Sequence, residues 1–243
     1  MKKVLSSGVL GILLLGLMFS AGFSQDADSI IAKMLDAQGG RKLLESIKDS
    51  TSHAEMDLPT MGISGTGIMY LKEPNKSRLD MEFMGMMMSQ GTDGEIAWMT
   101  NPQTGITEEM PAEIAEITND SAFGNSAFLN PKKYDIKHEY KGKETIDGKE
   151  YLRLDRLMPS GYVITYYINP ETYMIDRTKQ DSYDEMGMEV VEEAVLSDYE
   201  KVDGVMTAHS ITILRDGADY VVLALTDVSF NTGLEDSFFE MEK

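Results

Sequence analysis

The stretch VMTAHSITILRDGADYVVLALTDVSF at residues 205–230 decides the fold class, because it has the pattern of two long β-strands joined by a tight turn. β-Branched and other apolar residues dominate both halves, and Asp216-Gly217 between them tolerates the positive φ angles of a hairpin. Further Asp-Gly pairs lie between β-rich runs at 93–94, 147–148 and 203–204. Since consecutive strands joined by short turns must pair antiparallel, the sequence predicts a long antiparallel meander.

The same pattern extends upstream. No helix is indicated between residues 136 and 230, and strands are predicted at 151–157, 162–168 and 173–180. Several of these strands are about ten residues long, which suits a strongly curved sheet better than a small flat one. Neither the turns nor the composition marks a linker, so we predict one domain over residues 25–243.

Helical spacing is confined to two places. The apolar residues of the first segment are Ile30, Ile31, Met34 and Leu35. Asp26 or Asp28 can cap its start, and Gly39-Gly40 is expected to separate it from a second short helix. A further helix is predicted over 112–119, and its apolar side consists of Ile114 and Ile117.

Composition excludes several classes of function. The chain has 41 Asp and Glu against 22 Lys and Arg, which disfavours nucleic acid and anionic membrane surfaces as partners. It has no cysteine, so disulfides, thiolate nucleophiles and cysteine-ligated metals are excluded. His53, His138 and His209 stand alone, and no nucleophile elbow, phosphate loop or dinucleotide fingerprint is present. We therefore expect no catalytic residues, no metal and no cofactor.

The first residues have the layout of a secretory signal peptide. Lys2 and Lys3 precede an apolar run at 9–19, and small residues follow it. We predict cleavage after Ser24, which makes residues 1–24 a leader. No cysteine follows the run, so a periplasmic protein without a lipid anchor is expected.

Methionine is unusually common, with 19 residues. Met84, Met86 and Met88 are predicted on one strand face, and methionine repacks easily around varied apolar ligands. A Met-rich core is the alternative interpretation. Because the apolar residues exceed what one sheet face can bury, we predict a single apolar cavity lined by Met84, Met86, Met88, Trp98, Ile30, Met34, Ile114 and Ile117.

A series of short motifs occurs in order along the chain: AQGGR at 37–41, GIMYLKEPN at 67–75, RLDM at 78–81, DGEIAW at 93–98, DGKEY at 147–151, YYINPETY at 166–173, DYEKVDGV at 198–205 and DSFFEM at 236–241. Together they resemble the outer-membrane lipoprotein-sorting family. The resemblance implies an α+β, mainly antiparallel LolA/LolB-like fold, an incomplete curved β-barrel whose concave apolar side is closed by helices. In carriers of that family the cavity shields lipoprotein acyl chains in the periplasm.

One position departs from the family pattern. Carriers have an arginine before the Pro-Asn of the second hairpin, where it helps to hold the lid closed, and this chain has Glu73 there. Glu73 offers only acceptors, so its lid donors must be amides, hydroxyls or cations, and the cationic candidates are Lys33, Arg41 and Lys42. Exposed ion pairs contribute about 0–1 kcal/mol, so apolar burial is expected to dominate lid closure.

Three functions stay open at this stage. The first is a periplasmic carrier of lipoprotein acyl chains or another apolar ligand, which could use a donor or acceptor protein at the inner or outer membrane. The second is an envelope sensor or interaction module with the same fold. The third, a hydrolase, has no motif in its favour.

Overall fold

The computed structural model describes residues 26–101, 104–184 and 187–241. The predicted leader at 1–24 lies outside the described residues. Within them, no helix is long and apolar enough to cross a membrane.

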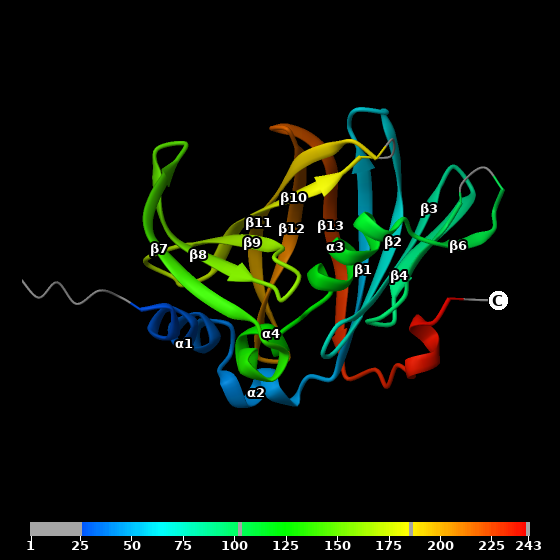
Figure 1. The fold of residues 1–243 in the computed structure, drawn as a ribbon. Coiled ribbons are helices and arrows are strands. Elements are labelled where there is room, and N and C mark those ends of the chain that lie inside the picture. The colour runs from blue at the N-terminus through cyan, green and yellow to red at the C-terminus, as the bar shows by residue number, and fades with distance from the viewer. Residues whose placement is uncertain (1–25, 102–103, 185–186, 242–243) are drawn as a thin grey trace, which may run out of the picture.

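One thirteen-stranded sheet runs through both halves of the chain in the order β6-β5-β4-β3-β2-β1-β13-β12-β11-β10-β9-β8-β7. Its strands are β1 (Asp49–Leu58), β2 (Ile63–Lys72), β3 (Lys76–Phe83), β4 (Met86–Thr92), β5 (Ala97–Thr100), β6 (Thr107–Glu109), β7 (Lys137–Ile146), β8 (Lys149–Leu157), β9 (Val163–Ile168), β10 (Ile175–Tyr183), β11 (Glu189–Val202), β12 (Val205–Arg215) and β13 (Ala218–Phe230). All neighbours pair antiparallel, and the edge strands β6 and β7 do not pair with each other. The sheet is therefore an open, curved half-barrel, as predicted (Figure 1).

The hairpin turns follow the Asp-Gly prediction at three of four places. Asp147, Asp203 and Asp216 have φ of 51°, 47° and 50°, and each precedes a glycine with positive φ. At the fourth, the Asp93 carboxylate instead accepts the amides of Glu95 and Ile96 in a wider turn. An unpredicted tight turn occurs at Met84-Gly85, with φ of 53° and 79°, and it ends β3.

The connection from β6 to β7 has to travel from one edge of the sheet to the other. It does so through α3 (Ala112–Ser121), α4 (Ser126–Leu129) and the 3-10 turn η1 (Pro131–Tyr134). Figure 1 shows α3 and α4 in front of the sheet, between its two edges. We call residues 112–134 the lid. The prediction of a helix at 112–119 is confirmed, whereas α4 and η1 were not predicted.

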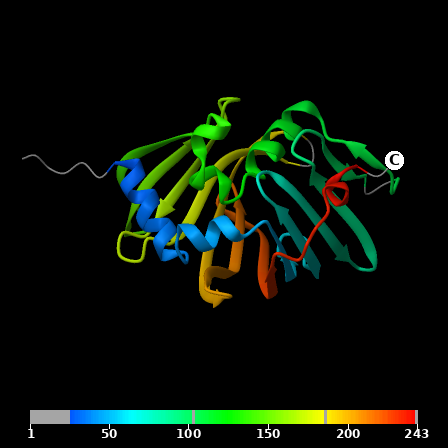
Figure 2. The ribbon, with the colours of Figure 1, turned by 90° about the horizontal axis from the view of Figure 1, so that it is seen from below.

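Two N-terminal helices lie across the lower end of the strands (Figure 2). They are α1 (Ala27–Ala37) and α2 (Arg41–Ser46), separated at the glycine pair as predicted. Asp26 caps α1 by accepting the amide of Ser29 at 2.7 Å. The inward side of α1 packs on strands β8 and β9 in one core cluster. This cluster includes Ile30, Met34, Leu35, Leu152, Leu154, Ile164 and Ile168.

The C-terminal segment packs on the outer, convex face. Its 3-10 turn η2 (Asp236–Phe239) buries Phe239 completely, and the Trp98 indole donates to the Phe239 carbonyl at 2.8 Å. Arg78 lies over the rings of both Trp98 and Phe238. In the register, Trp98 lies opposite Gly91 and Gly91 opposite Arg78, so these three share the outer face.

This packing predicts a large stability contribution from Phe239. We expect Phe239→Ala to lower the free energy of unfolding by about 3–5 kcal/mol, because it empties a fully buried ring site. Chemical denaturation measures the change. Met84→Ala, at an exposed hairpin turn, is the control and should change stability by less than about 0.5 kcal/mol. Equal effects of the two substitutions would contradict the assignment of Phe239 to the core.

Candidate functional site

Two adjoining cavities lie between the concave face and the lid. The smaller, of about 460 Å³, is under α4 and has apolar walls that include Phe123, Phe128, Tyr166, Leu196, Val228 and Phe230. The larger, of about 700 Å³, is under α3 and has apolar walls that include Met99, Met110, Ile114 and Ile117. Leu71 and Ala122 line both cavities, so the two are neighbours.

The cavity walls are mixed and not uniformly apolar. Gln90, Gln180 and the Arg215–Glu192 ion pair, at 3.4 Å, line the larger cavity. Asp49, Glu73 and Arg156 line the smaller one. The concave side therefore suits a guest that has both an apolar body and a few polar groups.

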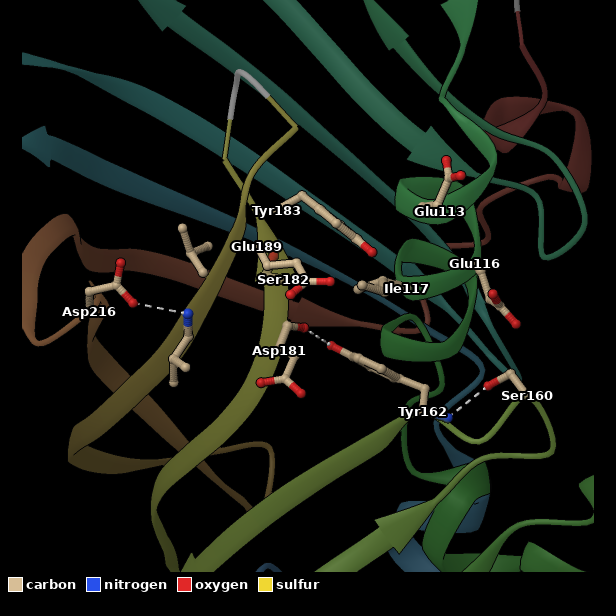
Figure 3. Close-up of a pocket in the computed structure, with 12 residues that line it drawn as sticks. Glu113, Glu116, Ile117, Ser160, Tyr162, Asp181, Ser182, Tyr183, Glu189 and Asp216 are labelled. Atoms are coloured by element: carbon tan, nitrogen blue, oxygen red, sulfur yellow. Dashed lines mark hydrogen bonds between the residues drawn. The ribbon is translucent and has the colours of Figure 1, made fainter.

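An outer cleft of about 570 Å³ lies on the other side of α3 (Figure 3). Glu113 and Glu116 of α3 and Asp181 of β10 are among the residues that line it, and Tyr162 donates to the Asp181 carbonyl at 2.9 Å. Burial raises the pKa of the Tyr162 phenol. The cleft also shares Ile117 with the larger cavity, so α3 separates an acidic exterior from the interior.

Glu73 holds the lid from the β2 side. Its carboxylate accepts the backbone amides of Asn125 at 2.7 Å and Ser126 at 2.9 Å, where α4 begins. The amide of Gly124 donates to the Pro74 carbonyl at 3.1 Å. A Cβ at Gly124 would lie 2.5 Å from the Glu73 carboxylate, so a side chain at this position would push the carboxylate away from its present place.

Arg156 holds the same lid segment from β8. Its guanidinium donates to the carbonyls of Phe123 and Asp120, each at 3.2 Å. Residues 120–126 of the lid are thus bound by the Glu73 carboxylate, an acceptor, from β2 and by the Arg156 guanidinium, a donor, from β8. Hydrogen bonds to charged groups contribute about 1.5–3 kcal/mol each, so polar contacts matter more for lid closure than expected from the sequence.

The prediction that Lys33, Arg41 or Lys42 donates to Glu73 is wrong. The alternative prediction, that amides are the donors, is confirmed. Arg41 does reach the lid, but it donates to the Leu129 carbonyl at 2.9 Å. Lys33 donates to the Tyr173 hydroxyl at 3.1 Å. Backbone amides are the donors because the start of a helix leaves its first N–H groups without partners inside the helix.

The structure separates the eight residues predicted to share one cavity. Ile114 and Ile117 line the larger cavity, whereas Ile30 and Met34 are fully buried in the core under α1.

The other four residues, Met84, Met86, Met88 and Trp98, lie outside the two cavities because of the turn at Met84-Gly85 and the strand register. Met84 and Met86 are 79% and 60% exposed beside the Met84-Gly85 turn. Met88 packs against a second core cluster, which contains Phe83. Trp98 faces the outer side of the sheet, so its predicted place in the cavity is wrong.

His138, which the sequence shows only as an isolated histidine, contacts a wall residue of the smaller cavity. Its ring stacks on Phe128 at 5.0 Å between centroids, and it pairs with Arg156 across β7 and β8. Burial, and secondarily the Arg156 charge, lower the pKa of His138 from 6.5 to about 4. Its Nε2 has no hydrogen-bond partner. Neither His138 nor Arg156 has a sequence signal, because only the strand register brings them together.

Comparison with solved structures identifies the architecture. A LolA superfamily protein from Nitrosomonas europaea matches with a TM-score of 0.57 and 15% identity, over 88% of this chain and 97% of that one. The chain has the LolA-like fold. A putative outer membrane lipoprotein-sorting protein domain from Vibrio parahaemolyticus matches at 0.54 and 19% identity, over 86% and 97%. A DUF1329 family protein from Desulfovibrio piger matches at 0.56 and 16%, over 86% and 97%.

No protein-family model matches the sequence, and no curated protein is similar enough to match it. The LolA-like assignment therefore concerns the fold. Among residues 26–101, 104–184 and 187–241, no group of three or more His, Asp or Glu residues is arranged to hold a metal ion.

The Glu73 contacts predict how the lid opens. We expect Glu73→Ala to accelerate hydrogen exchange at the amides of Asn125 and Ser126 by on the order of tenfold or more, because two charge-assisted bonds are lost. Glu73→Gln should have a smaller effect, since one acceptor oxygen remains. Glu82→Ala, on the exposed outer face of β3, is the control. Unchanged exchange in Glu73→Ala would contradict the lid contact.

His138 predicts a pH dependence of stability. Its pKa in the folded state lies below the usual 6.5, so the unfolded chain binds the proton first as the pH falls. Stability is therefore fully present above 6.5 and is lost between 6.5 and about 4, by up to roughly 3 kcal/mol from this group. We expect His138→Phe to lose less stability than the parent over this range in denaturation titrations. Parallel pH profiles would contradict the assignment.

Proposed function

We propose that this chain is an exported periplasmic protein that binds lipoprotein acyl chains or another apolar ligand. The guest occupies the two cavities under the lid. The observation that carries the proposal is their position: they adjoin, they lie on the concave face of a LolA-like sheet, and one crossing segment covers them.

The cavity sizes support a ligand of this kind. Both volumes fall within the roughly 300–1,000 Å³ of ordinary small-molecule sites. Aromatic and branched side chains, among them Phe128, Phe230 and Ile117, supply apolar contact along both. Among the described residues, no strand ladder joins residues 112–134 to the sheet, but α4 is anchored because its apolar side chains are buried in the core cluster. None of the α3 side chains is buried, and the end of α3 is held by the Arg156 contacts. The α3 side of the lid is therefore the part that rearranges to admit a guest.

The similarity to a putative lipoprotein-sorting domain supports the same reading at the level of fold. Exchange of acyl chains with a donor or acceptor protein at the inner or outer membrane is part of the proposal. Catalysis is not part of the proposal, because no contact among the described residues marks a cavity side chain as an activated nucleophile.

A second candidate function, an envelope interaction module, is favoured by one separate observation. Met61, Met84, Met86 and Met87 are exposed at the tips of two hairpins whose strands pair through Gly65 and Phe83. Exposed methionines suit adaptable contacts with a protein partner. Substituting these four by serine would abolish partner binding under this alternative and leave lipid binding unchanged under the first.

Displacement of a fluorescent fatty-acid probe tests the cavity. We expect Ile117→Asp to weaken probe binding by about tenfold or more, because it brings an unpaired carboxylate to the walls of the larger cavity. Met84→Asp adds the same charge at the exposed turn and is the matched control. Equal affinities in both variants would contradict the proposed site. Mass spectrometry of organic extracts of the protein, purified from its native periplasm, would then identify the guest.

A further inference from the structure

Arg156 is a buried guanidinium that has no carboxylate partner in the part of the chain that the structure describes. It is 2% exposed and lines the smaller cavity. Its contacts are the two lid carbonyls and the ring of Tyr166, 5.6 Å away. Among the described residues, none is a hydrogen-bond partner of its Nε. A buried charge with neutral partners only is costly, so a protein that keeps one normally supplies a counter-charge.

The carboxylates close to Arg156 are already engaged. Asp155, next in the chain, faces the other way and accepts from Arg153 and Thr165 at 3.0 Å each. Glu73 accepts the lid amides, and Asp49 accepts the backbone amides and hydroxyl of the C-terminal segment. None of these can neutralise Arg156 without giving up its own partners.

A second unsatisfied polar atom lies beside it. His138 is directly opposite Arg156 in the register, and its Nε2 is buried without a partner. Arg156 presents donors, and the neutral imidazole can donate or accept. Two orphan polar atoms on neighbouring strands, next to an aromatic cavity wall, point to a polar group that arrives from outside the protein.

We propose that Arg156 binds the anionic head group of an amphiphilic guest, a carboxylate or a phosphate, while the attached acyl chain lies along Phe128, Tyr166 and Phe230. This inference rests on the proposed function and specifies its ligand as an anionic lipid. The acidic outer cleft on the other side of α3 would repel an anionic head group. The head group therefore reaches Arg156 through the smaller cavity.

The head group takes the place of the two lid carbonyls. Arg156 Nε is closed off from solvent while those carbonyls are bound, so access requires residues 120–123 to move away. A guanidinium forms two parallel bonds with a carboxylate or phosphate, in which both partners are charged and the geometry is bidentate, whereas the two lid carbonyls are neutral and supply no counter-charge. Binding of the head group therefore releases one of the two contacts that keep the lid closed.

Competition with a neutral fluorescent lipid probe tests this with three ligands that have the same chain: palmitate, palmityl phosphate and methyl palmitate. We expect the parent protein to prefer palmitate, palmityl phosphate or both over the methyl ester by about tenfold or more. The preferred anion identifies the head group. Arg156→Gln should remove that preference while the affinity for the ester changes by less than about threefold.

Two further variants complete the test. Lys141→Gln removes one positive charge from an exposed pair with Glu139 and should leave the preference unchanged. Arg156→Lys keeps the charge but loses the planar fork, so it should reduce the preference even if Arg156→Gln fails to fold.

The possible failures are distinguishable. No preference for either anion in the parent protein, or an unchanged preference in Arg156→Lys, would overturn the head-group site. Equal weakening of acid and ester in Arg156→Gln would also overturn it and would assign Arg156 to the lid alone. Failure of the parent protein to bind any of the ligands would overturn the proposed function itself.

Discussion

The structure depends on one topological constraint: strands β6 and β7 follow each other in the chain but lie at opposite edges of a thirteen-stranded sheet. The two halves of the sheet join through the β1–β13 pair, so the connection between the halves must cross the open side. A crossing segment has no neighbouring strand to pair with, and its backbone groups need other partners. The lid and the cavities beneath it are consequences of that strand order.

Two residues of opposite charge supply several of those partners, in addition to Arg41 and the Pro74 carbonyl. Glu73 accepts amides at the start of α4, and Arg156 donates to carbonyls at the end of α3. Each uses the backbone groups that a helix end leaves free, N–H groups at the start and C=O groups at the end. The departure at position 73 therefore does not remove the lid contact. The side chain at position 73 accepts hydrogen bonds from the lid where an arginine would donate them. Arg156, on a different strand, supplies the donors.

The local parts of this arrangement could be predicted from the sequence, and the non-local parts could not. Asp-Gly turns and apolar periodicity act over a few residues, which is why the hairpins, α1 and α3 were expected. The sequence predicts Met84 on a strand face because Met-Gly is a weak turn signal compared with Asn-Gly or Asp-Gly. The excess of apolar residues does not say which face each one occupies: Met99 lines the larger cavity, and the next residue in the alternation, Trp98, lies on the outer face. Arg156 and His138 meet through strand pairing alone.

Charge is distributed unevenly between the surface and the interior. The chain carries a net charge of −19, yet its buried charged side chains among the described residues are Asp49, Asp155 and Arg156. Both aspartates are satisfied by protein donors, and the arginine has only neutral acceptors. Surface charges are screened over about 8 Å at physiological ionic strength, whereas a buried charge acts at full strength on whatever adjoins it. In the proposed head-group site, selectivity for a guest originates at Arg156 inside the half-barrel, and the acidic exterior limits unspecific association with anionic surfaces.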